Sequence, residues 1–423
     1  MGYFECYDLD SRFRPIFESW NPVTLYYHIV IDYDQRRTII VRTATKKDEE
    51  FILDALEALM DDLPADVVKI TVSDDSQLLS SSTEADDDGT IIPFYPSPSE
   101  FLPHLPKIHR SELTEIERLG LQADHTTYMS APEKEEHVVF KYYINEANIE
   151  IFWHELQCIS RIPKHPNIVP FDRLVVESHG PNGQEMVVGF TTPFIAGGTV
   201  EDDVSRVFRL KHLRQLLATI DYLNLRLGIV HSDICMWNLL IDPETDDLKI
   251  FDFNMGAKLG WEGDGDRQTF QYDENRSDVK LAVFTVYEII TRDQSHREEY
   301  HVEELDTSMV LDLEDWEKHP DVNLDEGVDA SEYRRILMEW VKAREQTDAE
   351  IASYKQAPES IDWPSVPLLA NHDAPGTRRR SQSRSGLIKE GKPFIKWQRP
   401  PTRYLENILE SNRLLANGEV VPL

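Results

Sequence analysis

The 423-residue chain contains little cysteine: Cys6, Cys158 and Cys235 are its only three, and they lie far apart. This spacing forms neither a disulfide framework nor a zinc-binding pattern, and it is typical of a reducing compartment. We therefore expect an intracellular, cytoplasmic protein, with a nuclear location also open. No uninterrupted apolar run approaches the roughly 20 residues that a membrane-spanning helix requires.

Basic residues are also scarce, with 44 Lys and Arg against 77 Asp and Glu and a formal net charge of −33. An acidic surface repels the phosphate backbone, so we expect no nucleic-acid partner. The N-terminus has no apolar core of a secretory signal. Met1-Gly2 resembles the start of a myristoylation signal, but the sixth residue is Cys6 rather than Ser or Thr. We expect no membrane association.

The stretch HSDICMWNLLIDPETDDLKIFDFN, residues 231–254, carries the clearest chemical pattern. Two short apolar runs, Leu239–Ile241 and Leu248–Phe251, flank a polar turn and predict a β-hairpin. The hairpin would bring Asn238 and Asp252 together, beside Asp233. Two oxygen ligands and a carboxylate base are what a magnesium-assisted phosphoryl transfer requires. Each residue alone would suit a turn or cap, but the H-x-D-x-x-x-x-N spacing followed by D-F-x favours phosphotransfer.

Residues 1–80 predict a small α/β region of their own. Strands are expected over Leu25–Asp32, Thr38–Thr43 and Val67–Val72, and Asp48–Asp61 has helical spacing. Residues 81–107 continue an acidic, Ser-rich stretch and become Pro-rich, which is typical of a linker. An interaction module and an extension of the following domain both remain open for residues 1–80.

A further domain is expected over residues 108–345. Its predicted strands are Glu112–Leu119, Thr126–Met129, His137–Tyr143, Ile168–Val176 and Met186–Phe194, and its predicted helices are Asn145–Ile162, His212–Leu227, Asp278–Thr291 and Ser331–Glu345. Lys141 lies among apolar residues of one strand, where a buried ammonium needs an anionic partner. An exposed lysine on an edge strand is the alternative. Glu155 is a candidate partner on the following helix, and Glu146 and Glu150 are its rivals.

A C-terminal extension, residues 346–423, completes the expected organisation. It contains the basic run RRRSQSRSG within a predicted loop, residues 371–386, where Ser381 and Ser383 suit a basic-directed kinase. A solvated flexible loop is the favoured interpretation of this run. An amphipathic segment, Tyr404–Leu415, is expected to pack back onto the domain.

These motifs resemble those of the eukaryotic protein-kinase superfamily, in particular a divergent group from fungi with DFN in place of DFG. The resemblance covers roughly residues 113–345. It implies an α+β, bilobal fold, with a small β-rich N-lobe at about 108–196, a larger helical C-lobe at about 197–345, and the α/β region as an N-terminal extension. It also implies ATP and Mg²⁺ as cofactors.

The resemblance assigns roles residue by residue. Lys141 of VVFK would hold the α- and β-phosphates, with Glu155 as its ion-pair partner. Asp233 matches the catalytic base. The remaining matches are Gly120 of the phosphate lid, Thr192, Pro193 and Ile195 of the adenine-facing hinge, Asn238 and Asp252 as magnesium ligands, and His231 and Asp278 as structural supports.

Four departures from the family pattern stand out. Gln122 and His125 occupy positions of the lid where glycines are expected, which weakens close backbone approach to phosphates. Asn254 replaces the DFG glycine, a mild change because Asn tolerates left-handed backbone. Ser232 replaces an arginine whose positive charge interacts with the phosphorylated activation loop. Cys235 stands where serine/threonine kinases place a γ-phosphate-neutralising lysine, and no APE motif follows Asp252.

The leading hypothesis is an ATP- and Mg²⁺-dependent protein kinase-like phosphotransferase that acts on Ser or Thr hydroxyls of an unidentified protein. A second hypothesis is a pseudokinase scaffold that binds ATP or nothing and acts through protein contacts. A third is a small-molecule phosphotransferase of the aminoglycoside or choline type, which shares the H-x-D-x-x-x-x-N motif and a short activation segment.

Overall fold

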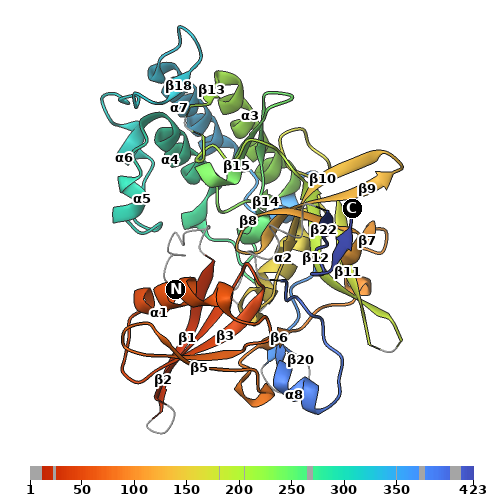
Figure 1. Cartoon of the computed structure of the whole chain (residues 1–423). Coiled ribbons are helices and arrows are strands. Elements are labelled where there is room, and N and C mark those ends of the chain that lie inside the picture. Colours follow the sequence, from red (N-terminus) through yellow and green to blue (C-terminus); the bar gives the residue numbers. More distant parts are fainter. Residues whose placement is uncertain are drawn as a thin grey trace. The chain divides into compact units, whose positions relative to one another are not determined.

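The computed structural model describes residues 12–21, 25–180, 182–203, 205–263, 270–348, 350–370, 377–400 and 411–423. The chain divides into two units, which are described separately. Figure 1 labels their helices and strands. The first contains Met1–Ile149, Asp172–Phe194 and Pro367–Leu423, and the second contains Glu150–Phe171 and Ile195–Val366. The fold is a mixed α+β one, rich in strands in its N-terminal part and helical later. No described helix is both long and apolar enough to cross a membrane.

The first unit begins with a five-stranded sheet and one helix, in which the three strands and the helix predicted within residues 1–80 are present and two further strands, β1 and β5, are added. The strands run in the order β1-β2-β3-β4-β5, and β3 alternates buried and half-buried residues because one face packs against α1. Asp48 caps α1 by accepting a hydrogen bond from the N–H of Phe51 at 3.0 Å. The elements are β1 (Phe13–Asn21), β2 (Leu25–Asp32), β3 (Arg37–Thr43), α1 (Glu49–Leu59), β4 (Lys69–Val72) and β5 (Leu78–Ser82).

A six-stranded sheet follows, in the order β7-β11-β12-β10-β9-β8. The β8–β9, β9–β10, β10–β12 and β11–β12 pairs are antiparallel, and β7 joins β11 in parallel. The strands β8, β9, β10, β11 and β12 each overlap a predicted one. They are β7 (Lys107–His109), β8 (Thr114–Gly120), β9 (Ala123–Ala131), β10 (Lys134–Tyr142), β11 (Arg173–His179) and β12 (Gln184–Pro193).

Residues 81–107, expected as a linker, contain short ordered elements. Among them, β6 (Ile91–Pro93) pairs with β21 (Ser381–Ser383) of the basic run, which the sequence alone suggested was a flexible loop. Charge complementarity explains this difference, because Arg384 and Lys389 form ion pairs with Asp88 and Asp86. The domain boundaries themselves stay a prediction.

The rest of the C-terminal extension adds small elements to the first unit. Residues 371–376 and 401–410 lie outside the described part of the chain, and so does most of the expected amphipathic segment Tyr404–Leu415. Ser381 donates a hydrogen bond to Glu146, and Ser383 caps α8. The elements are β19 (Leu369–Ala370), β20 (Arg378–Arg379), α8 (Arg384–Lys389), β22 (Asn412–Leu414) and β23 (Val420–Pro422).

A buried ionic cluster joins distant segments within this unit. Arg36 reaches the carboxylates of Glu115, at 3.1 Å, and Asp124, and Arg399 also pairs with Glu115. The guanidinium carbon of Arg36 lies 4.4 Å from the ring centroid of Tyr142. Buried charges require such pairing because their desolvation is costly. The N-terminal hairpin, the six-stranded sheet and the C-terminal segment are thereby held by one set of contacts.

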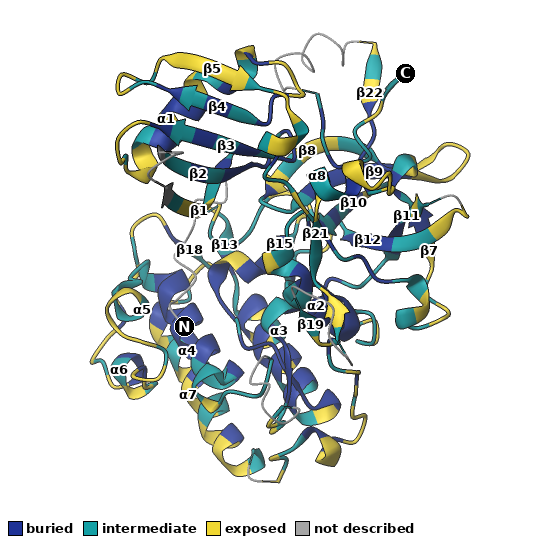
Figure 2. Cartoon of the chain, turned by 90° about the horizontal axis from the view of Figure 1, so that it is seen from below, coloured by how far each residue is buried: buried dark blue, intermediate teal, exposed yellow. Residues whose placement is uncertain are grey.

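The second unit is built around α4, which is buried along most of its length (Figure 2). Its core packs α3 and α7 against α4 through apolar side chains, as the circumference of Asp278–Thr291 predicts. The predicted helix His212–Leu227 instead divides into α3 and a wider π-helical stretch, Tyr222–Leu227, that ends at Gly228 with φ +70°. The helices are α2 (Ile149–Ile159), α3 (Leu210–Asp221), α4 (Asp278–Thr291), α5 (Ser295–Glu299), α6 (Ser308–Leu311) and α7 (Ala330–Thr347).

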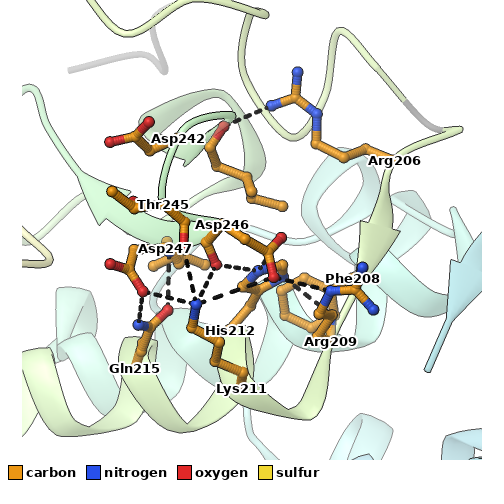
Figure 3. A network of polar contacts seen from close by, with 12 residues as sticks. Arg206, Phe208, Arg209, Lys211, His212, Gln215, Asp242, Thr245, Asp246 and Asp247 are labelled. Carbon is orange, nitrogen blue, oxygen red and sulfur yellow. Dashed lines mark hydrogen bonds and ion pairs between the residues drawn. The ribbon is translucent and has the colours of Figure 1, made fainter.

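The predicted hairpin is present as β15 and β16, with Leu239 paired to Ile250. Its turn is fixed to α3 by polar contacts (Figure 3). The ammonium of Lys211 lies 2.9 Å from a carboxylate oxygen of Asp247, and Gln215 bonds the same residue at 2.6 Å. The short strands of this unit are β13 (Val207–Phe208), β14 (Ile229–Val230), β15 (Leu239–Asp242), β16 (Asp247–Ile250), β17 (Ala257–Lys258) and β18 (Asn323–Leu324).

Residues 352–366 pack on the segment that follows the DFN motif. Lys258 is buried, donates to Asp362 at 2.8 Å, and lies within cation–π distance of three aromatic rings. Its ammonium is 4.3 Å, 5.3 Å and 5.5 Å from the ring centroids of Trp261, Tyr354 and Trp363. No pattern in the sequence predicts this packing.

His154 of α2 is tied to the same segment. Its Nε2 bonds the carbonyl of Gly256, and its ring stacks on Phe270 with centroids 3.9 Å apart. Burial lowers the pKa of His154 to about 4. The imidazole is therefore neutral in the folded protein at physiological pH.

This burial predicts a pH-dependent loss of stability. The unfolded chain binds a proton at His154 below about pH 6.5, whereas the folded chain binds it only near pH 4, so acid favours unfolding in that window. We expect the wild type to lose up to about 3 kcal/mol more than His154→Gln between pH 6.5 and pH 4, measured by urea unfolding. Gln keeps an N–H donor but does not titrate. Equal losses for both proteins would contradict this account.

Candidate functional site

Buried Asp278, the first residue of α4, fixes the backbone of the loop that carries Asp233. The side chain of Asp278 accepts hydrogen bonds from the N–H groups of His231 at 2.9 Å and Ser232 at 2.8 Å. Asn224 donates a third bond to it at 2.8 Å. Hydrogen bonds to a carboxylate are among the stronger ones in proteins, and they offset the burial of its charge. The core helix α4 therefore sets the position of the loop.

Ser232 adopts a strained backbone conformation, with φ +63°. Residues other than glycine rarely occupy this region, and it costs on the order of 1 kcal/mol or more. The hydrogen bond from its N–H to Asp278 holds the strained turn in place. The residue at this position thus shapes the loop, in addition to removing the cation that the family pattern places there.

His231 links this loop to the end of the hairpin. It is fully buried, and its Nε2 donates to the carbonyl of Phe251 at 2.9 Å. Its ring lies 4.7 Å from that of Phe253, measured between centroids. These contacts connect the loop to the end of the hairpin, and the supporting role of His231 stays a prediction.

The side-chain amide nitrogen of Asn238 donates two hydrogen bonds to Asp233. Nδ2 donates to the backbone oxygen of Asp233 and to its Oδ2, each at 2.9 Å. These bonds fix the orientation of the amide, and Oδ1 accepts no hydrogen bond from the described residues. An oriented amide oxygen is a suitable ligand for Mg²⁺.

Asp252 lies near Asn238 because the hairpin brings their chain positions together. The N–H of Phe251 donates to the carbonyl of Asn238 at 3.3 Å, and Asn254 Nδ2 donates to Asp252 Oδ2 at 3.1 Å. The left-handed residue is Asp252, with φ +67°, and not Asn254. Asn254 does not adopt the left-handed conformation, so the tolerance of Asn for it does not explain the residue at this position. Within the described ranges, no group of three or more His, Cys, Asp or Glu side chains is arranged to hold a metal ion.

Cys235 supplies no charge beside Asp233. Its thiol is buried and donates weakly to the carbonyl of Asp233, with sulfur and oxygen 3.4 Å apart. Burial raises the pKa of the Cys235 thiol well above its ordinary value, so the group is a neutral thiol.

Arg276 is a site residue that the sequence analysis missed. Its Nε donates to the carbonyl of Ser232 at 2.8 Å, and its Nη2 lies 3.2 Å from Asp233 Oδ1. Arg276 ends a short 3₁₀ turn, Glu274–Arg276, just before α4. Its position two residues ahead of Asp278 was the available signal, because Asp278 itself contacts the same loop.

Lys141 lies on β10, which is bordered by β9 and β12 in the interior of the sheet. The edge-strand alternative for this lysine is therefore wrong. Its ammonium lies 6.0 Å from the ring centroid of Phe190 on the neighbouring strand. Thr192 and Pro193 lie at the end of β12, paired with Val139 and Val138 of β10.

The lid region forms the β8–β9 hairpin, with Gly120 paired to Ala123. His125 occupies one of the expected glycine positions, and its ring stacks on Phe194 with centroids 3.8 Å apart. Its Nε2 also lies 2.9 Å from Nδ1 of His137. A bulky, engaged side chain thus replaces the small residue that close phosphate approach favours.

Glu155 and Ile195 belong to the second unit. Glu155 is buried on α2, and Ile195 precedes Gly197 and Gly198, whose φ values of +97° and +74° explain the glycine pair. The rival Glu146 accepts a hydrogen bond from Ser381. The pairing of Lys141 with Glu155 stays a prediction.

Comparison with known proteins gives one partial similarity. A segment of the chain is 34% identical over 86 residues to serine/threonine-protein kinase pim-2 of Danio rerio, covering 18% of this chain and 26% of that protein. No family model matches the chain. The partial match supports a protein kinase-like relationship. It does not identify the divergent fungal group.

The Asp278 contacts predict a large effect of a single substitution. Asp278→Ala leaves the N–H groups of His231 and Ser232, and one of the two amide hydrogens of Asn224, without their acceptor, so we expect a loss of about 3 kcal/mol or more in the free energy of unfolding. Asp321→Ala is the control, because that side chain is 78% exposed. Chemical unfolding of both variants measures the difference. Equal stability would show that Asp278 does not brace the loop.

Proposed function

We propose that this protein is an ATP- and Mg²⁺-dependent protein kinase-like phosphotransferase that acts on Ser or Thr hydroxyls of a protein. The observation that carries the proposal is the position of Asp233, whose two carboxylate oxygens are held by Asn238 and Arg276. A carboxylate held in this way can orient a hydroxyl, which is the main demand that phosphoryl transfer places on its base. The bilobal kinase arrangement and an intracellular location are parts of the same proposal.

The reaction proceeds by direct displacement. The acceptor oxygen forms a bond to the γ-phosphorus while the bond from that phosphorus to the β–γ bridging oxygen breaks, and ADP leaves with the bond's electrons. The hydroxyl proton passes to Asp233. Its carboxylate is partly exposed, with 31% of the side chain accessible, so an acceptor can reach it.

Asn238 and Asp252 are the residues proposed to hold Mg²⁺. Asn238 offers an oriented amide oxygen and Asp252 a carboxylate, which are the oxygen donors that this ion prefers. The bound ion would neutralise charge on the phosphates. Lys141 has the family role of contacting the α- and β-phosphates, and Glu155 that of orienting it.

The pim-2 match supports the acceptor class, because that protein is named as a serine/threonine kinase. The match covers about a quarter of its length. That this chain phosphorylates Ser or Thr hydroxyls of a protein is therefore part of the proposal.

A second candidate function is a pseudokinase scaffold that acts through protein contacts. The stacking of His125 on Phe194 favours it, since a lid with this side chain lacks the close backbone approach of a glycine-rich loop. A scaffold would need neither the Asp233 contacts nor the Asn238 amide orientation.

A transfer assay separates these candidates. Purified protein with radiolabelled ATP and Mg²⁺ is offered a mixed Ser/Thr peptide library and, separately, small alcohols and aminoglycosides. We expect peptide labelling that Asp233→Asn lowers by at least roughly 10²-fold, because the base is lost. Asp321→Asn is a matched control at an exposed position.

The other outcomes have distinct meanings. Labelling of the small molecules alone would replace the protein acceptor with a small-molecule one. Absence of any Asp233-dependent labelling, from a chain that still unfolds cooperatively, would contradict the enzyme proposal and favour the scaffold.

A further inference from the structure

Position 235 lacks the cation that a kinase-like loop uses beside its base. Cys235 is buried, and a cysteine side chain carries no positive charge in any protonation state, so it cannot offset charge on a transferring phosphoryl group. Phosphoryl transfer depends on positive charge around the phosphate oxygens. In a phosphotransferase with this loop, a cation beside the base would therefore come from elsewhere in the chain.

Arg276 brings a guanidinium to the same place from a different chain segment. One edge of the guanidinium binds the loop. Nε donates a hydrogen bond to the carbonyl of Ser232 at 2.8 Å, and Nη2 donates one to Asp233 Oδ1 at 3.2 Å. Nη1 has no acceptor among the described residues. The side chain is 28% exposed, and Nη1 is not one of the fully buried nitrogens that lack a partner.

Other cations of the second unit have different partners. Arg292 pairs with Glu201, Arg297 pairs with Glu288, and Lys258 lies in its aromatic surroundings. Among the described residues, Arg276 is the one cation whose side chain contacts Asp233. Its placement follows from α4, since Asp278 at the start of that helix binds the same loop.

We propose that Arg276 takes the place of the missing lysine: it orients Asp233 with one edge of its guanidinium and donates with Nη1 to the transferring phosphoryl group. This inference rests on the proposed phosphotransfer. Arg276 is thus a catalytic residue as well as a positioning one. A guanidinium suits both tasks because its planar fork donates along two edges at once.

The test compares Arg276→Met, Arg276→Lys and the control Arg335→Met, whose arginine pairs with exposed Glu332 and Glu339 on α7. Peptide phosphorylation is measured as kcat and KM for ATP, and unfolding midpoints show that each variant is folded. For Arg276→Met we expect kcat to fall by roughly 10²-fold with KM for ATP nearly unchanged, because the contact is made in the transition state. The kcat of Arg276→Lys should be about tenfold higher than that of Arg276→Met, since lysine restores the positive charge but not the planar set of donors.

A merely structural role would give a different pattern. Arg276→Met and Arg276→Lys would then lower the unfolding midpoint by similar amounts, and their kcat values would be the same. This result would overturn the inference. An unchanged kcat in Arg276→Met would overturn it as well. Wild-type protein that transfers no phosphate would contradict the proposed function and this inference together, so the two failures are distinguishable.

Discussion

The hydrogen bonds of one buried carboxylate determine the geometry of the candidate site. Asp278 accepts from two successive backbone N–H groups and from Asn224, and it begins the helix around which the second core is built. A strained residue, Ser232, is stable there because these contacts compensate for its conformation. Since Arg276 lies two residues before Asp278, one short segment supplies both the support of the loop and the cation that reaches Asp233.

This arrangement explains how the site can tolerate an altered sequence. The loop has Ser232 and Cys235 at the positions where the protein-kinase pattern has an arginine and a lysine. The contacts that define the position of Asp233 come from Asn238 and Arg276, which those changes leave intact. The lid region differs more, because His125 is fixed by stacking and hydrogen bonding where a glycine is expected. The contacts therefore fix the residues of the proposed base and metal positions, whereas the proposed phosphate lid departs from the family pattern.

Local patterns in the sequence predicted what depends on neighbouring residues. The strand Leu25–Asp32, the helix Asp278–Thr291 and the β15–β16 hairpin each follow from short-range periodicity, and the structure confirms them. The hairpin in turn explains the approach of Asn238 to the DFN motif. What could not be predicted depends on partners far apart in the chain. Arg36 meets Glu115 and Asp124, Lys258 meets Trp363, and the acidic run meets the basic run, and no periodicity encodes these pairs.

The account depends most directly on whether the site binds nucleotide together with magnesium. Thermal unfolding of the full chain with ATP, with and without Mg²⁺, measures this, because a ligand that binds only the folded state raises its stability by RT ln(1 + [L]/Kd). We expect millimolar MgATP to raise the unfolding midpoint, ATP with a chelator to raise it less, and Asn238→Ala to reduce the difference. No shift at millimolar MgATP would contradict the account.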